Sequence, residues 1–107
     1  MKILMKQKDE SVSAKKGIIL KQTGSKISAD IIHLQQQTGI RVNNRSPFII
    51  QASGVDPLTA EKKIFNSTWI WTDVFVEVQN HKTIDVYIDS QNPSKYYMDL
   101  SSIGINE

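Results

Sequence analysis

The sequence contains no cysteine, and this absence excludes several classes of site. A disulfide framework, a thiolate nucleophile and a zinc site built on cysteine are all ruled out. The five glycines are too dispersed along the chain to form a phosphate-binding loop. No apolar run approaches the roughly 20 residues that span a bilayer, and charged residues follow residues 1–5 too closely for a signal peptide.

The chain has the size and composition of one small globular domain. It has 107 residues, of which 39% are hydrophobic and 22% are charged. Its net charge of +2 is the sum of two segments with opposite charge. Residues 1–26 hold seven lysines against two acids and carry +5. Residues 27–107 hold six cations against nine acids and carry −3. Nucleic acid is therefore not the favoured partner, since no body-wide cationic surface is available for it.

The spacing of apolar residues changes near Gly24. Before this glycine, the spacing predicts a helix over residues 10–22, with Asp9 or Ser11 as its N-cap. After it, apolar and polar residues alternate as in half-buried strands, and the alternation slips at Ile31-Ile32, where we expect a β-bulge. The segments with alternating or extended patterns are residues 27–34, 48–52, 62–67, 74–78, 83–89 and 96–100.

These patterns predict a mainly β fold, a small antiparallel barrel or sandwich of five to six strands preceded by one N-terminal helix. We expect no second helix. Residues 1–23 are predicted to form a basic helical lead-in, and residues 24–107 are predicted to form the small β-barrel domain. The change in charge and the change in periodicity therefore divide the chain at nearly the same place.

Two tryptophans, Trp69 and Trp71, lie two positions apart. On a strand they would share one face, because successive side chains point to opposite sides. If exposed, they would form a stacking platform for a sugar ring or a base. We expect them to be buried instead, because a domain of this size needs large apolar side chains for its core.

Residue types that commonly act in catalysis are few and scattered. His33 and His81 lie on separate predicted elements, both in solvent, and no nucleophile-elbow motif accompanies them. Asp85, Asp89 and Asp99 could bind a cation or act as acid and base. The expected roles are simpler, with Asp85 facing solvent and Asp89 fixing a turn through its side chain. We therefore predict no catalytic residue, no metal site and no cofactor.

Four lysines of the basic segment lie on or beside the predicted helix: Lys15, Lys16, Lys21 and Lys26. Each could attract an anionic membrane surface, with about 1 kcal/mol per lysine near a bilayer. The alternative is a solvated helix face without a partner.

Five segments resemble, in order, those of a bacterial family known as domain of unknown function 3592. They are GSKISADI (24–31), VNNRSPF (42–48), FNS (65–67) with IW (70–71), IDVYID (84–89) with NP (92–93), and YYMDL (96–100). The chain departs from the family at Asn44, where glycine is usual, and at Val74, where proline often follows the aspartate.

The resemblance implies a small β-domain attached to one or two transmembrane helices that precede it, and it implies no catalytic residues. We therefore expect the full-length protein to be membrane-associated and this part of it to be soluble. The expected function is a non-enzymatic interaction domain that binds a protein partner or itself, and touches an anionic membrane through its N-terminal lysines. Two alternatives stay open: a barrel that binds an oligosaccharide or single-stranded nucleic acid through Trp69 and Trp71, and a hydrolase that uses Asp85, Asp89 or Asp99.

Overall fold

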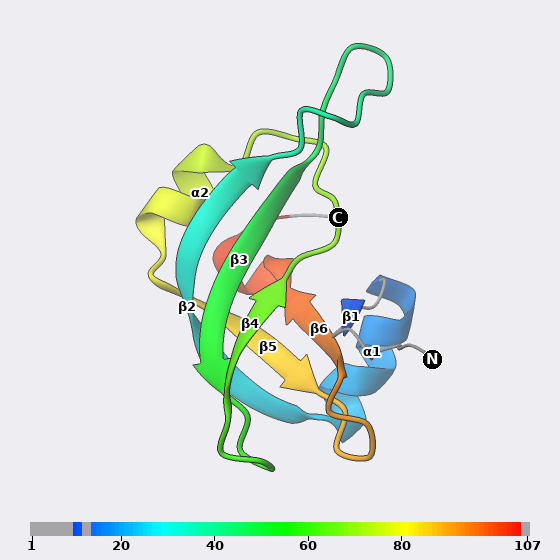
Figure 1. Ribbon diagram of the computed structural model, residues 1–107, viewed down its shortest axis with the longest axis vertical. Helices are drawn as coiled ribbons and strands as arrows, with labels where there is room; N and C mark the ends of the chain where they lie inside the picture. Colours follow the sequence, from blue (N-terminus) through cyan, green and yellow to red (C-terminus); the bar gives the residue numbers. More distant parts are fainter. Residues whose placement is uncertain (1–9, 12–13, 106–107) are drawn as a thin grey trace, which may run out of the picture.

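The structure, a computed structural model, describes residues 10–11 and 14–105 of the chain. Within these residues six strands form one sheet, which two α-helices and a 3-10 helix flank (Figure 1). The strands are β1 (Glu10–Ser11), β2 (Ser25–Gln36), β3 (Phe48–Val55), β4 (Lys62–Asn66), β5 (Thr83–Ile88) and β6 (Lys95–Asp99). The helices are α1 (Ala14–Thr23), α2 (Phe75–Asn80) and the 3-10 helix η1 (Leu100–Ile103).

The long strand β2 organises the sheet, whose order is β1-β6-β5-β2-β3-β4. It pairs antiparallel with β3 on one side and with β5 on the other. Beyond these, β4 and β6 continue the antiparallel pairing, whereas β1 joins β6 in parallel. The register of β2 against β3 shifts between Ile31 and His33, so the bulge expected at Ile31-Ile32 is confirmed. An extra residue bends a strand and increases its twist, which helps this sheet to curl.

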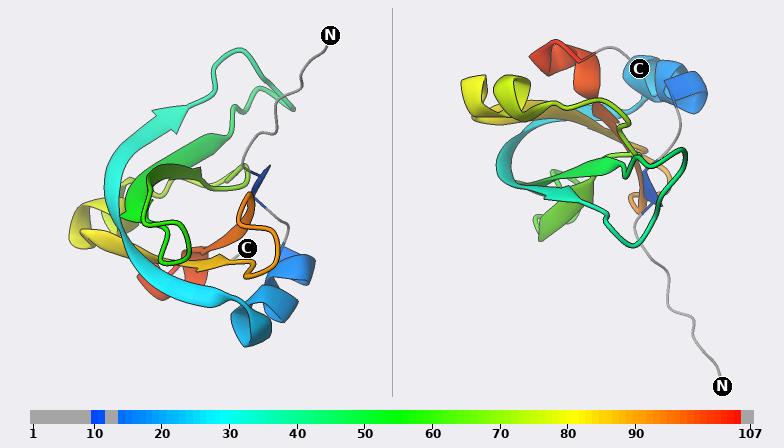
Figure 2. Two further views of the ribbon diagram at one scale, coloured as in Figure 1. Left: turned by 60° about the horizontal axis from the view of Figure 1, so that its bottom comes forward. Right: turned by 90° about the horizontal axis from the view of Figure 1, so that it is seen from above.

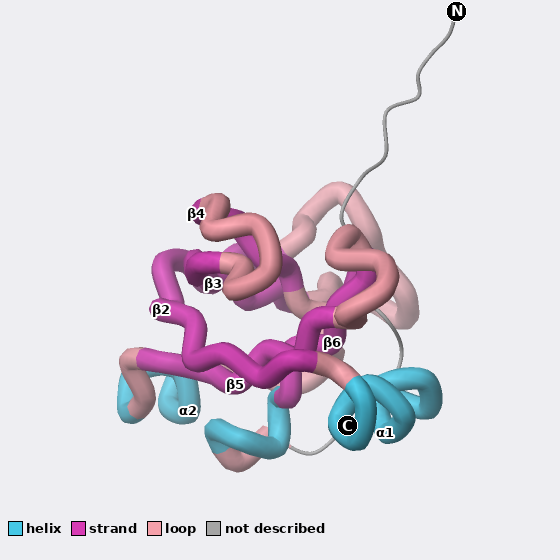
Figure 3. Tube along the Cα trace, turned by 90° about the horizontal axis from the view of Figure 1, so that it is seen from below, coloured by secondary structure: helices cyan, strands magenta, loops and turns pink. Residues whose placement is uncertain are grey.

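The sheet curls into a half-barrel, and strands β4, β3, β2, β5 and β6 follow one another around a common interior (Figures 2 and 3). The two ends of the curl meet through Tyr96, whose Oη accepts the Asn66 backbone N–H at 2.9 Å. The rings of Phe65 and Tyr96 pack edge to face with their centroids 5.0 Å apart. The mainly β, barrel-like fold after an N-terminal helix is therefore confirmed.

Helix α1 covers the outer face of β6 (Figure 3). Residues 96–99 of β6 are buried in succession, which requires cover on both faces of the strand. The backbone of Gly17 lies against the Tyr97 ring, so close that a Cβ at Gly17 would come within 2.5 Å of it. Gly17 weakens the helix intrinsically by about 1 kcal/mol, and the close approach to Tyr97 explains its presence there.

The prediction that the helix begins at residue 10 is wrong. Helix α1 begins at Ala14, and Glu10–Ser11 form strand β1, which pairs with Lys95 and Tyr96. The reason is tertiary: an edge strand carries unpaired main-chain groups, and the incoming chain pairs with those of β6. Asp9, one of the two candidate N-caps, lies outside the described residues.

The prediction of no second helix is also wrong, because residues 75–80 form α2. Val74 is buried and Val78 packs against the core, while Phe75 and Val76 are exposed. Positions 74 and 78 fit a strand period of two, but they also fit the i, i+4 spacing of a helix. The Asp73 Oδ1 accepts the Phe75 N–H at 3.0 Å, and this local bond favours a turn over a strand at that point.

Candidate functional site

The two tryptophans lie on the segment that connects β4 to α2. Ile70 pairs with Phe48 through two main-chain hydrogen bonds of 2.7 and 2.9 Å, and its side chain enters the core. The alternation of an extended chain then places Trp69 and Trp71 together on the outer side. They are 49% and 37% exposed, and their rings meet edge to face with centroids 6.0 Å apart. The expectation that they are buried is therefore wrong, since Ile70 takes the inward position between them.

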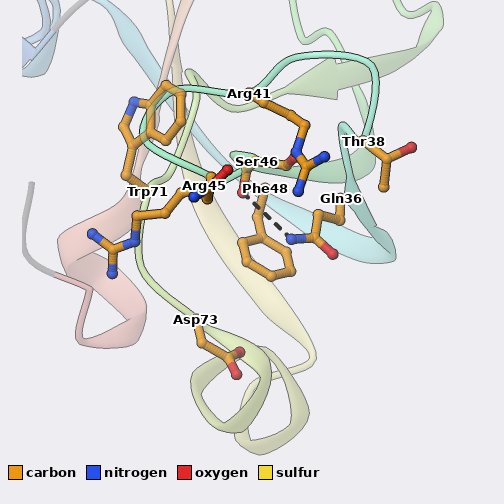
Figure 4. A pocket seen from close by; sticks show the side chains of 9 residues that line it. Gln36, Thr38, Arg41, Arg45, Ser46, Phe48, Trp71 and Asp73 are labelled. Carbon is orange, nitrogen blue, oxygen red and sulfur yellow. Dashed lines mark hydrogen bonds between the residues drawn. The ribbon is translucent and has the colours of Figure 1, made fainter.

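A groove of about 480 Å³ lies beside Trp71, where the long loop after β2 meets the segment before α2. Its lining side chains are Gln36, Thr38, Arg41, Asn44, Arg45, Ser46, Phe48, Trp71 and Asp73, and we call it the Trp71 groove. Figure 4 shows Trp71 and Arg45 on one side and Gln36 and Thr38 on the other, with Arg41 and Phe48 between them. Aromatic faces are thus combined with many hydrogen-bonding groups, as in sites for polar small molecules.

The loop that carries most of these residues is held by a tight turn at its tip. Val42 and Arg45 exchange two main-chain hydrogen bonds of 2.8 and 3.0 Å. Between them, Asn43 and Asn44 have φ values of 53° and 64°, the left-handed region that asparagine tolerates better than most residues. A two-residue turn with both central φ values positive matches the twist of a β-hairpin. It fixes the main chain on both sides of the turn.

Neither arginine of this groove was selected as a site residue from the sequence. The sequence does carry a signal for them, since Arg41 and Arg45 flank the Val42–Asn44 segment. The structure shows no carboxylate of the described residues within 4.0 Å of either guanidinium.

Two of the lysines expected to face a membrane lie close to aspartates. The Lys21 Nζ lies 3.1 Å from Oδ2 of Asp99, and the Lys26 Nζ lies 3.8 Å from Oδ2 of Asp85. Asp85 and Asp99 are direct neighbours across β5 and β6, so these two lysines offset a local pair of like charges. The side chains of Lys15 and Lys16 lie outside the part of the chain that the structure describes.

The three aspartates considered for hydrolysis have structural contacts. The Asp99 Oδ1 accepts hydrogen bonds from the backbone N–H and the hydroxyl of Ser101, at 3.2 and 2.6 Å. Asp89 accepts the Gln91 N–H at 2.9 Å, so its expected turn-forming role is confirmed. Asp85, Asp89 and Asp99 line neither the Trp71 groove nor the second groove described below.

A second groove, of about 570 Å³, lies between β2 and α2 and contains both histidines. His33 and His81 are exposed, as expected, but the structure brings them to one groove together with Asp30 and Lys82. The Nδ1 of His81 lies 2.9 Å from the Glu77 carbonyl oxygen, which ties this ring to α2.

Within residues 10–11 and 14–105, no group of three or more histidines and acids is arranged to hold a metal ion. In the same part of the chain, no helix combines the length and apolar character needed to cross a bilayer. Comparisons of the chain with protein-family models, with curated proteins and with solved structures each find no match.

Proposed function

We propose that this protein is a non-enzymatic binding domain whose ligand is an oligosaccharide, held by Trp69, Trp71 and the Trp71 groove. The exposure of the two neighbouring indoles carries the proposal. A sugar ring has an apolar face of C–H groups that packs on an aromatic face, while its hydroxyls need hydrogen-bonding partners. The groove supplies such partners next to Trp71, including the side chains of Gln36, Asn44 and Ser46.

The strand connectivity supports the same proposal by analogy. Strand β2 pairs with both β3 and β5, and the sheet curls without closing fully. This arrangement resembles partly open five-stranded barrels that bind oligosaccharides and oligonucleotides, in which the loop between the first two strands contributes to the site. In this chain the corresponding loop is residues 37–47, which supplies most of the groove. Fold analogy alone does not assign a function, so the exposed tryptophans remain the main argument.

Of the two ligand classes, an oligosaccharide fits the charges better than a nucleic acid strand. A site for single strands follows the phosphate backbone with several cations. The Trp71 groove offers two arginines and also contains the carboxylate of Asp73. Residues 27–107, which include the groove, carry a net charge of −3.

The test is a binding screen of the intact chain against neutral, carboxylated and sulfated oligosaccharides and an oligothymidylate, followed by calorimetry on the best ligand. Trp71→Ala is expected to weaken binding by about tenfold or more, since stacking on an aromatic ring is worth about 1–3 kcal/mol. Phe75→Ala is the matched control, because Phe75 is an exposed aromatic residue outside the groove. The proposal fails if no oligosaccharide binds, or if the two variants bind equally well.

The basic N-terminal segment supports a second proposal, that the domain works beside an anionic membrane, in keeping with its resemblance to domain of unknown function 3592. Residues 1–26 carry +5, and since Lys21 and Lys26 are paired with aspartates, the proposal rests on the five lysines before residue 17. The chain is expected to float with phosphatidylserine vesicles at low salt and not with neutral phosphatidylcholine vesicles. Equal flotation with both would contradict this proposal.

A further inference from the structure

The two arginines of the Trp71 groove indicate the charge of the ligand, an inference that rests on the proposed function. Arg41 and Arg45 are both exposed and both line the groove beside Trp71 (Figure 4). The ion pairs of the described residues all use lysines elsewhere: Lys21, Lys26 and Lys63. The guanidinium groups in the groove are therefore without a carboxylate partner from the described residues.

The one carboxylate in the groove does not neutralise them. Asp73 lines the groove, but it lies beyond 4.0 Å of both guanidinium groups, and its Oδ1 accepts the Phe75 N–H at 3.0 Å. Two cations against one carboxylate leave the groove cationic on a β-domain that is otherwise acidic. Such local cationic character favours an anionic ligand group at this place.

The backbone that carries the arginines is fixed before any ligand arrives. The turn at Asn43 and Asn44 is closed by two hydrogen bonds between Val42 and Arg45, and the Gln36 Nε2 donates to the Ser46 carbonyl oxygen across the base of the loop at 3.5 Å. A preformed loop reduces the entropy that binding must overcome. The main chain from which the two arginine side chains project is therefore held in place beside Trp71.

From this arrangement we propose that the ligand is an acidic oligosaccharide, in which one sugar ring packs on Trp71 and anionic groups of neighbouring rings pair with Arg41 and with Arg45, whose side chains lie on different sides of the groove (Figure 4). A guanidinium presents parallel N–H donors that match two oxygens of a carboxylate or a sulfate. Two separate arginines and one aspartate suit a ligand with a few anionic groups, rather than the continuous charge of a nucleic acid backbone.

The experiment compares a trimer of galacturonic acid, its methyl ester and a sulfated galactose trimer, by calorimetry on the intact chain. The methyl ester keeps the ring stereochemistry and removes the charge. We expect at least one acidic trimer to bind at least tenfold more tightly than the ester, and its affinity to fall as NaCl is raised. The two acidic probes distinguish a carboxylate from a sulfate.

Three variants separate this inference from the proposed function on which it rests. Arg41→Gln and Arg45→Gln are expected to weaken binding of the acidic trimer about tenfold and binding of the ester by a smaller factor, because only the acid loses an ion pair. Lys62→Gln is the matched control, because Lys62 is an exposed cation outside the groove and its loss is expected to change neither affinity.

Equal affinity for acid and ester, or arginine variants that bind the acid as the wild type does, would overturn the acidic-ligand inference. If Trp71→Ala still weakens binding in that case, the proposed function stands. If Trp71→Ala binds every probe normally, or no probe binds, both fail. Tighter binding of oligothymidylate than of either acidic trimer would also overturn the inference and would assign the groove to nucleic acid.

Discussion

Lys63→Met is expected to destabilise the fold strongly, because it removes the charge that balances a buried carboxylate. Asp56 is 0% exposed, and its Oδ2 lies 3.3 Å from Nζ of Lys63, whose side chain is 15% exposed. The Oδ1 accepts the Leu58 N–H at 2.8 Å, whereas Oδ2 accepts no hydrogen bond from the described residues. Without Lys63, the Asp56 carboxylate would have no cation of the described residues within 4.0 Å.

Removing one partner of a buried ion pair costs about 3–5 kcal/mol, which is a large part of the about 5–15 kcal/mol that stabilises a domain. A loss of about 3 kcal/mol lowers Tm by roughly 15 °C in a domain of this size. The measurement is urea and thermal unfolding followed by circular dichroism. Lys62→Met, on the same strand but exposed, is the control and is expected to change stability by less than about 0.5 kcal/mol.

A double variant tests the electrostatic cause. Asp56→Asn keeps an acceptor for the Leu58 N–H and removes the charge, so Asp56→Asn combined with Lys63→Met is expected to recover more than half of the lost stability. Equal losses from Lys62→Met and Lys63→Met would refute the reasoning. So would a double variant as unstable as Lys63→Met alone.

Three further changes test packing, the loop turn and a buried hydrogen bond, each by urea unfolding. Gly17→Ala is expected to lower stability by about 1–3 kcal/mol, because its Cβ would lie 2.5 Å from the Tyr97 ring and overpacking outweighs the gain in helix propensity. Asn44→Gly is expected to raise stability by about 0.5 kcal/mol, because its φ of 64° suits glycine better. Ser67→Ala is expected to cost about 1–3 kcal/mol, because the buried Ser67 Oγ accepts the Ile50 N–H at 2.9 Å.

Each of these predictions has an outcome that would contradict it. Gly39→Ala is the control for Gly17→Ala, since nothing lies within 4 Å of a Cβ built at Gly39, and equal losses at both positions would contradict the close packing. A glycine at position 44 that lowers stability would contradict the turn geometry. Wild-type stability of Ser67→Ala would show that the Ile50 N–H finds another acceptor.

Local patterns in the sequence were sufficient for much of the sheet. The slip at Ile31-Ile32 predicted the bulge in β2, and the extended patterns of residues 83–89 and 96–100 predicted β5 and β6, which are neighbours in the sheet. Asp89 formed its predicted turn bond. These features depend on residues close together in the chain or on a period of two, which the sequence displays directly.

The errors arose where the local spacing fits two structures or where a distant element decides the outcome. The spacing of Val74 and Val78 fits both a strand and a helix, so local spacing could not distinguish these two structures. Trp69 and Trp71 are exposed because Ile70 pairs with Phe48 and takes the inward position. The Trp71 groove could not be located from the sequence for the same reason, since it joins a loop and a segment more than 20 residues apart.

The most direct test of the proposed binding surface is a titration followed by nuclear magnetic resonance. The chain has two tryptophans and therefore two indole N–H signals, which are followed as the galacturonic acid trimer or the sulfated galactose trimer is added. With at least one of these ligands, both indole signals and the side-chain N–H signals of Arg41 and Arg45 are predicted to shift together and to saturate at one ligand per chain. Shifts that fall elsewhere on the domain, or no shifts with either ligand, would contradict the assignment of this surface as a site for an acidic oligosaccharide.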